Sequence, residues 1–423
     1  MTAFPHLTQF RLERSEHDVA HLIFDCPGRT MNLFSEAAIE ELGRVAAWLP
    51  NADVRGLVIR SGKANAFCAG ADLTELGVAY DMIMAAPLHA RFTLAADHFF
   101  PLSAALRALE TAGKPIAAAV AGLALGGGCE LAMAAHYRVL VDDTKVVLGL
   151  PESLVGLLPG GGGTQRLPRL IGIDAALPIL LEGTRLAGRD ALDAGLVDAL
   201  CALGDEIAVA EAWVIGDPPA VQPWDRDDYT PVPPADVTVL IAPARTQILR
   251  TTLGHYPAPL AILDCVELGL PQVFDGAIRS ENAIFAHLIQ REEPRDMIRT
   301  MFLAKTDYER LARRSELPAA IGEVVDRARP ILDAARGDKG LQLAGFFGVE
   351  GEPARARSQR GLWLDRDDAK GARAAVDRVS SAIVELAAHL PDEHKRLVDY
   401  AIVSQLGFPA YLGGPIEYAI GCR

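Results

Sequence analysis

The first 200 residues alternate short apolar runs with amphipathic stretches. Residues 19–24, 57–61 and 116–120 are apolar runs of strand length, and each is bounded by polar or glycine-containing segments. Residues 35–49 instead carry apolar side chains at helical spacing, with Ser35 in position to cap the helix N-terminus. Strands alternating with helices predict an α/β fold for this part of the chain.

The pattern changes in the second half of the chain. From residue 177 onward the spacing predicts helices, interrupted at 216–234 by a proline-rich polar segment that we expect to be a wrapped linker. Two later stretches, AIGEVVDRARPILDAA at 320–335 and AVDRVSSAIVELAAHL at 375–390, place apolar residues at helical spacing. Such helices bury one face, so we expect this region to serve assembly rather than catalysis.

The candidate chemistry lies in the segment AVAGLALGGGCELA at 119–132. A run of glycines between an apolar strand and a helix leaves backbone N–H groups uncovered, and these can hold an oxygen that gains negative charge. Glu130 would then lie in the first helical turn, and Glu152 follows Pro151, which favours the opening of another helix. Two carboxyl groups can divide general acid and general base work, although an isolated glycine run is more often simple close packing.

Four segments carry a family resemblance through their order and spacing: AFCAGADL, AGLALGGGCELA, LGLPESLVGLLPGGGGTQRLPRLIG and GRDALDAGLVDAL. Through these segments the chain resembles the crotonase (enoyl-CoA hydratase/isomerase) superfamily over roughly residues 8–200, and is most similar to the hydratase part of multifunctional fatty-acid β-oxidation enzymes. The resemblance implies an α/β fold with a crotonase-type ββα spiral core, followed by a mainly α-helical C-terminal region.

The resemblance also implies an activity and a site. The reaction is addition of water to 2-enoyl-CoA to give 3-hydroxyacyl-CoA, with 3-enoyl to 2-enoyl isomerisation as an additional activity. Glu130 and Glu152 are implied as the acid/base pair, and the N–H groups of Ala71 and Gly127 as the oxyanion hole. The implied substrate-binding residues are Thr30, Met31, Ala69, Ala71, Asp72, Leu73 and Gly127. Coenzyme A enters with the substrate, so neither a separate cofactor nor a metal is expected.

At some positions the residue differs from the one that is usual in the family motifs. Cys68 stands where serine or alanine is common, and we expect it to be a small buried packing residue. Ser153 replaces an aliphatic residue. The glycine run at 160–163 is unbroken, and we expect the additional glycine to loosen the turn after Glu152, which leaves the preference for acyl chain length open but not the reaction type.

Net charge and cysteine spacing limit the kinds of partner and the compartment that we expect for this chain. A net charge of −14 argues against nucleic acid or an anionic membrane surface, so anionic coenzyme A would need local cations such as Arg29, Lys63 or Lys114. The cysteines, at 26, 68, 129, 201, 265 and 422, form neither a CxxC pair nor a zinc-like spacing with histidine, which suggests a reducing compartment. The chain shows neither a signal pattern nor an apolar run of about 18 residues, so we expect a cytoplasmic protein.

The domain organisation predicted from the sequence has three parts. Residues 1–200 form the acyl-CoA hydratase core, 201–314 a linker and helical extension, and 315–423 a helical domain whose last segment resembles the end of 3-hydroxyacyl-CoA dehydrogenase. A GxGxxG turn is absent from the sequence, so we expect neither an NAD-binding domain nor hydride transfer. We expect a homo-oligomer, with a thiolase or dehydrogenase as a further partner. The alternatives are a non-catalytic acyl-CoA-binding or scaffold subunit, or another crotonase reaction such as thioester hydrolysis or C–C cleavage.

Overall fold

The computed structural model describes residues 4–345 and 366–421, and the chain packs into two compact units. The first unit comprises the residues up to 153, residues 158–241 and residues 261–290; the second comprises 154–157, 242–260 and the residues from 291 onward. The division predicted at residues 200 and 314 was based on family resemblance, whereas the two units are defined by packing. The packing does not test the predicted division, which stays a prediction. Cys422 and residues 346–365 of the predicted C-terminal domain lie outside the described residues.

A six-stranded sheet forms the base of the first unit, in the order β1-β2-β3-β5-β7-β10. The β1–β2 pair is antiparallel and the remaining pairs are parallel. Its strands are β1 (Phe10–Arg14), β2 (Ala20–Phe24), β3 (Leu57–Ser61), β5 (Ile116–Val120), β7 (Tyr137–Val141) and β10 (Ala199–Cys201). The three apolar runs of the sequence become β2, β3 and β5, so those strand predictions are confirmed.

A second sheet, of four strands in the order β4-β6-β8-β9, carries the glycine-rich turns. Its strands are β4 (Ala66–Cys68), β6 (Leu123–Leu125), β8 (Val147–Gly149) and β9 (Arg185–Ala187). The change to helices predicted from residue 177 is confirmed for most of the described chain beyond it, but two short strands were missed, because β9 pairs antiparallel with β8 and β10 pairs parallel with β7. β9 and β10 have three residues each, too few to show the alternation that is typical of a strand. They are defined by pairing with neighbouring strands rather than by their own sequences.

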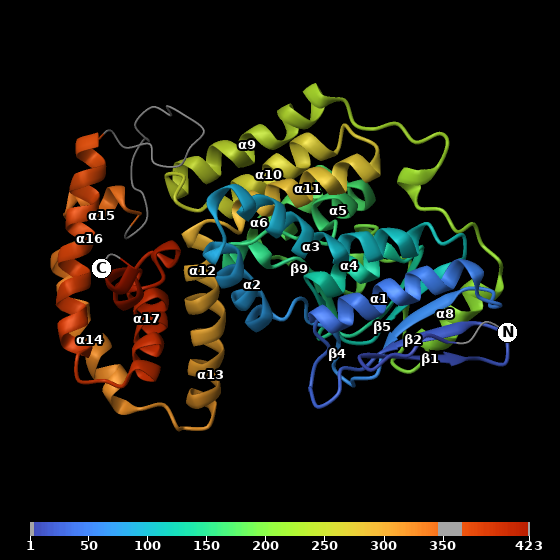
Figure 1. Cartoon of the computed structure of the whole chain (residues 1–423), viewed down its shortest axis with the longest axis horizontal. Coiled ribbons are helices and arrows are strands. Elements are labelled where there is room, and N and C mark those ends of the chain that lie inside the picture. Colours follow the sequence, from blue (N-terminus) through green and yellow to red (C-terminus); the bar gives the residue numbers. More distant parts are fainter. Residues whose placement is uncertain (1–3, 346–365, 422–423) are drawn as a thin grey trace. The chain divides into compact units, whose positions relative to one another are not determined.

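Helices cover the sheets of the first unit (Figure 1). They are α1 (Glu36–Trp48), α2 (Leu73–Ala85), α3 (Leu88–Glu110), α4 (Gly127–Ala134), α5 (Gly163–Ile171), α6 (Ile173–Glu182), α7 (Gly188–Asp193), α8 (Glu206–Ile215) and α11 (Phe274–Leu288). As predicted, Ser35 caps α1 by accepting a hydrogen bond from the N–H of Ala38. On one face of the larger sheet, Ala210 and Val214 of α8 pack against Val58 and Ala119.

The proline-rich segment 216–234 wraps the first unit as predicted. Apart from a short 3₁₀ helix, Pro223–Asp225, it has no regular structure before Pro234 opens α9 (Pro234–Thr252). Gln222 is buried, and its Nε2 lies 3.3, 3.1 and 3.1 Å from the carbonyl oxygens of Met133, Ala134 and Ala135. These are carbonyls at the C-terminal end of α4, which otherwise lack partners within that helix.

The second unit is helical over its described residues. It includes the last part of α9 and the beginning of α10 (Pro257–Gly269). It also contains α12 (Glu292–Met297), a π-helical segment Ile298–Ala304, α13 (Lys305–Arg313), α14 (Ala319–Ala334), α15 (Lys339–Leu343), α16 (Arg366–Ala387), α17 (Asp392–Leu406) and α18 (Pro415–Gly421). The apolar stripes predicted at 320–335 and 375–390 are confirmed, because α14 and α16 bury Ile321, Val325 and Ile383 in one core with α17 (Figure 1). In the described ranges, no helix is both long and apolar enough for a membrane span.

Candidate active site

Glu130 is held at the start of a fully buried helix. The chain leaves β6 through Gly126, whose φ of 54° and ψ of −126° suit only glycine, and α4 begins at the next residue. Every residue of α4 is buried, and Glu130 is 2% exposed. Glu130 therefore lies in the first turn of a helix, as the sequence predicted.

Glu152 approaches the same turn from the other side. It opens a helix after Pro151, as predicted, and this helix is the short 3₁₀ helix Glu152–Val155. A Cβ atom at Gly126 would lie 2.8 Å from Oε1 of Glu152, so only glycine leaves room for this carboxyl group. Oε2 of Glu152 is buried and has no hydrogen-bond partner among the described residues. One oxygen of the carboxyl group is therefore uncommitted.

The glycine run at 160–163 holds Glu130 in place. The N–H groups of Gly161 and Gly163 each donate to Oε1 of Glu130, at 2.7 Å. The N–H of Gly162 donates to a third carboxylate, Glu281 of α11, at 2.7 Å. The expectation that the run loosens the turn was wrong, because alternate N–H groups are bound by buried carboxylates on two sides.

The two predicted carboxyl groups have different electrostatic surroundings. Burial raises the pKa of Glu130, but the N–H groups of Gly163 and Gly161 and the charge of Arg166 oppose that rise. Burial raises the pKa of Glu152 well above its usual range, and the negative charges of Glu130 and Glu281 add to the effect. Glu130 therefore ionises at lower pH than Glu152, which is the arrangement that separates a base from an acid.

The predicted oxyanion donors lie on two adjoining turns. Gly70 has a φ of 99°, and a Cβ atom there would lie 3.7 Å from the backbone nitrogen of Gly127. Ala71, the next residue, is exposed and bridges to Phe34 in a parallel arrangement. In the described structure, neither the N–H of Ala71 nor that of Gly127 donates to a backbone carbonyl. Both groups can therefore donate to an incoming oxygen.

The remaining predicted substrate-binding residues flank these turns. Thr30 and Met31 are exposed, the N–H of Ala69 donates to the carbonyl of Asn32 at 3.0 Å, and Leu73 is the first residue of α2. Asp72 is buried and already engaged. It caps α2 by accepting from the N–H of Thr74 at 3.0 Å.

Each cation considered for coenzyme A has a partner within the protein. Arg29 pairs with Asp72 at 2.7 Å, and Lys63 pairs with Asp25 at 2.7 Å. Lys114 donates to the carbonyl of Val54 at 2.7 Å. Binding an anion with one of these side chains would therefore compete with an existing contact.

Cys68 is buried behind the first turn, as expected for a packing residue. Burial raises the pKa of its thiol to about 12, so the thiolate is scarce near neutral pH. Among the described residues, we find no group of three His, Cys, Asp or Glu side chains arranged to hold a metal ion.

Two buried charged residues of the site were missed from the sequence. Glu281 lies on the apolar face of α11, and Arg166 of α5 donates to the carbonyl of Gly161 and to Oε1 of Glu110, both at 2.5 Å. Both residues are 0% exposed. The sequence contains one signal for such residues, which is a charged residue on the apolar stripe of an amphipathic helix. Charged residues are rarely buried unless they are paired, so this position indicates a buried partner.

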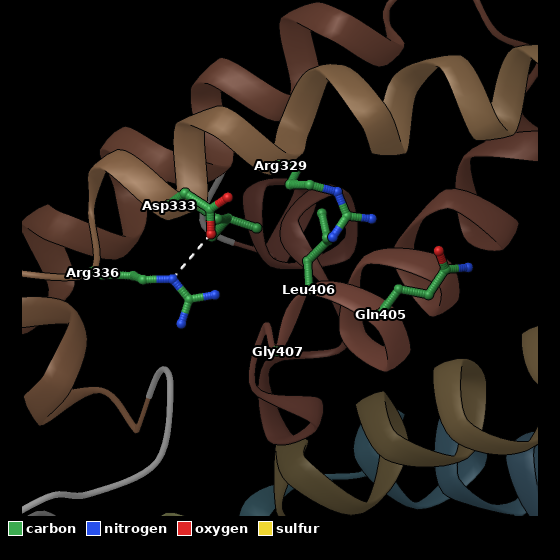
Figure 2. A pocket seen from close by; sticks show the side chains of 7 residues that line it. Arg329, Asp333, Arg336, Gln405, Leu406 and Gly407 are labelled. Carbon is green, nitrogen blue, oxygen red and sulfur yellow. Dashed lines mark hydrogen bonds and ion pairs between the residues drawn. The ribbon is translucent and has the colours of Figure 1, made fainter.

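A separate cavity of about 240 Å³ lies in the second unit, beside α14 and the end of α17 (Figure 2). Arg329, Asp333, Arg336 and Gln405 line it, and Asp333 accepts a hydrogen bond from Nε of Arg336 at 3.0 Å. None of the sequence-predicted site residues lines this cavity, so it is not the candidate active site.

Comparison with known proteins gives matches over most of the chain. Residues 14–215 match the family model described as Enoyl-CoA hydratase/isomerase. The chain is 34% identical over 361 residues to the fatty acid oxidation complex subunit alpha of Shewanella frigidimarina, covering 84% of this chain and 48% of that protein. The protein of the same name from Shewanella loihica is 36% identical over 323 residues, which cover 75% and 44% of the two chains. The chain thus spans about half the length of the curated relatives it matches.

Solved structures show a related fold. Human mitochondrial delta3-delta2-enoyl-CoA isomerase matches with a TM-score of 0.50 at 21% identity, covering 71% of this chain and 99% of that one. At this level of identity the likeness establishes the fold and leaves the reaction open.

Proposed function

The chain belongs to the enoyl-CoA hydratase/isomerase family through residues 14–215, and we propose that it adds water to 2-enoyl-CoA thioesters, giving 3-hydroxyacyl-CoA. The observation that carries this proposal is the meeting of two glutamate carboxyl groups with unlike surroundings beside one glycine turn. Glu130 is bound by backbone N–H groups, whereas Oε2 of Glu152 is unengaged among the described residues. An isomerase-type proton shift needs one carboxyl group, whereas addition of water uses a base and an acid together.

We assign the base to Glu130 and the acid to Glu152. The carboxylate of Glu130 takes a proton from water as the water oxygen bonds to C3 of the substrate. The protonated carboxyl group of Glu152 supplies the proton that bonds to C2. The assignment follows from the pKa directions, because Glu130 ionises first and Glu152 keeps its proton to higher pH.

The thioester oxygen gains negative charge in this step. Electrons of the double bond move toward the carbonyl as the C3–O bond forms, giving enolate character. We propose that the N–H groups of Ala71 and Gly127 receive that oxygen. Loss of one donor of this kind typically raises the barrier by about 3–4 kcal/mol, so the geometry of the two turns matters more than any side chain in them.

The assay is the loss of absorbance of the conjugated thioester over a panel of 2-enoyl-CoA substrates of increasing chain length. A parallel panel of 3-enoyl-CoA substrates, followed by the gain of conjugation, tests for isomerisation. Turnover of 2-enoyl-CoA by the unmodified chain, lost in Glu152→Gln, is the expected result. Tight acyl-CoA binding without turnover in either panel would instead favour a scaffold role.

We also propose that the chain assembles with a partner protein. The relatives are named as alpha subunits of a fatty acid oxidation complex. We propose that the helical second unit serves assembly rather than catalysis, because every predicted site residue belongs to the first unit. Sedimentation of the chain alone and with a candidate thiolase or dehydrogenase would test this.

A further inference from the structure

Glu281 is a buried carboxylate that neither the family match nor the sequence motifs include. It lies on α11 beyond the matched residues 14–215, and it is 0% exposed. Its two oxygens bind the turn before α5. Oε1 accepts from the N–H of Gly162 at 2.7 Å, and Oε2 accepts from the N–H of Thr164 at 3.1 Å and hydrogen bonds to the Thr164 hydroxyl group.

The same turn binds Glu130 through its other two N–H groups. Gly161 and Gly163 donate to Glu130, while Gly162 and Thr164 donate to Glu281, so successive N–H groups point to opposite carboxylates. A shift of the turn toward either glutamate would lengthen its bonds to the other. Both carboxylates therefore contribute to fixing the turn in space.

A neighbouring contact fixes the far side of the turn. Nε2 of Gln165 donates to the Thr164 hydroxyl oxygen at 2.9 Å and to the carbonyl of Cys265 on α10, also at 2.9 Å. The hydroxyl group is thus positioned toward Glu281 by a side chain that is itself anchored. Residues on α5, α10 and α11 all contribute to the position of the turn.

We propose that Glu281 is a positioning residue of the active site: it holds the 161–164 turn so that the N–H groups of Gly161 and Gly163 keep the Glu130 carboxylate in place for catalysis. The inference rests on the proposed hydratase function for its kinetic part. Its structural part, that Glu281 fixes the turn, does not depend on which reaction the site performs.

Charge supports the same role. Burial and the negative charge of Glu130 raise the pKa of Glu281 to about 8, opposed by the bonds from Thr164 and Gly162 and by the charge of Arg166. When it is ionised, Glu281 in turn helps to raise the pKa of Glu152. Two further titratable groups interact with the charge of Glu281. One is the thiol of Cys265 on α10, whose pKa is raised by burial and by that charge. The other is the guanidinium of Arg169 on α5, whose pKa is lowered by burial, an effect that the charge of Glu281 opposes. Removing the charge at Glu281 should therefore lower the pKa of Glu152.

The test compares Glu281→Gln with a matched control on the same helix, Asn282→Ala. Asn282 donates to the carbonyl of Ala96 at 3.1 Å, away from the hydrogen bonds that Glu281 makes with the turn. A glutamine at 281 accepts from only one of the two N–H groups, since its amide nitrogen is a donor. The measurements are hydrogen exchange of a peptide covering 160–166, kcat and KM for 2-enoyl-CoA, and the pH dependence of kcat.

For Glu281→Gln we expect faster exchange in that peptide, a kcat lower by about 10- to 100-fold and a KM within about twofold, because a displaced base costs rate rather than affinity. The alkaline limb of the pH profile should move to lower pH. Asn282→Ala should resemble the unmodified chain in all of these. Thr164→Val, which removes the hydroxyl contact and keeps the N–H, should lie between them and provides the test if Glu281→Gln does not fold.

Several results would overturn the inference. Unchanged exchange at 160–166 in Glu281→Gln, or in Thr164→Val if that is the folded variant, would mean that Glu281 does not hold the turn. Faster exchange with unchanged kcat and pH profile would leave Glu281 a structural residue only. Equal losses in Asn282→Ala would point to general loosening of α11. If the unmodified chain hydrated no 2-enoyl-CoA, the proposed function would fail, and the exchange measurement alone would decide the structural part.

Discussion

Replacing Glu130 with glutamine and with alanine separates the chemical role of this residue from its structural role. A glutamine oxygen can occupy the position of Oε1 and accept from Gly161 and Gly163, which now donate at 2.7 Å each. The turn is then kept and the base is lost. A positioned base contributes about 10²–10⁴-fold, so kcat should fall by that factor, or about 3–5 kcal/mol of barrier, with little change in KM.

Alanine at the same position removes both the base and the acceptor. The N–H groups of Gly161 and Gly163 are then buried without partners, and each such group costs about 1–3 kcal/mol. We therefore expect Glu130→Ala to lower the free energy of unfolding by about 2–6 kcal/mol relative to the unmodified chain, in addition to losing activity. Glu130→Gln should lose far less stability.

The assays are initial rates with 2-enoyl-CoA and equilibrium unfolding in urea, both at one pH. Glu36→Gln, at an exposed position in the first turn of α1, is the control for removal of one carboxylate charge. The reasoning about the base is refuted if Glu130→Gln keeps the kcat of the unmodified chain. The reasoning about the turn is refuted if Glu130→Ala and Glu130→Gln unfold at the same urea concentration.

Four other predictions follow from the same structure. Gly127→Val should abolish turnover, because a Cβ atom there lies 2.9 Å from the ring of Phe34; a folded variant with ordinary kinetics would place the oxyanion hole elsewhere. The pH profile of kcat should be bell-shaped. Activity should fall on acidification as Glu130, whose pKa is raised, takes up a proton, and should fall at higher pH as Glu152, whose pKa is raised further, loses its proton. The profile of Glu152→Gln should lack the alkaline limb that this group causes. Calorimetry should detect no NAD or NADH binding, and micromolar affinity would contradict this. A chain ending at Arg314 lacks the helices that build the core of the second unit, so it should aggregate or change its oligomeric state, while any soluble fraction keeps hydratase activity; complete inactivity of a well-folded fragment would place an essential contact in the tail.

The strands that the sequence predicted are apolar runs bounded by polar or glycine-containing segments, and the helix predicted at 35–49 has apolar residues at helical spacing. β3 and β5 match the predicted ranges, and the position of Glu130 in the first turn of α4 follows from the glycines before it. The short strands β9 and β10 could not be predicted, because each has three residues and is defined by its partner.

The site was only partly predictable for a similar reason. Glu130 and Glu152 are close in sequence and flanked by glycine and proline, which mark turns. Glu281 and Gly162 are 119 residues apart, and nothing local to either position indicates that they meet. Asp72 was implied as a substrate-binding residue, and in the structure its side chain caps α2 and pairs with Arg29. Aspartate followed three residues later by Glu75 is a typical signal for a helix N-terminus, whereas the pairing with Arg29, 43 residues away, has no local signal.

The contact of Gln222 with the end of α4 limits where the chain can be altered. Proline-rich connections are usual places for inserting tags or fusing other proteins, because few contacts cross them. Here the connection supplies a side chain whose Nε2 donates to carbonyl oxygens of Met133, Ala134 and Ala135, behind the helix that carries Glu130. An insertion next to Gln222 would loosen that helix from its far end, whereas one at the exposed turn around Gly204 would not. A segment that the sequence marks as a spacer is thus part of the support of the catalytic helix.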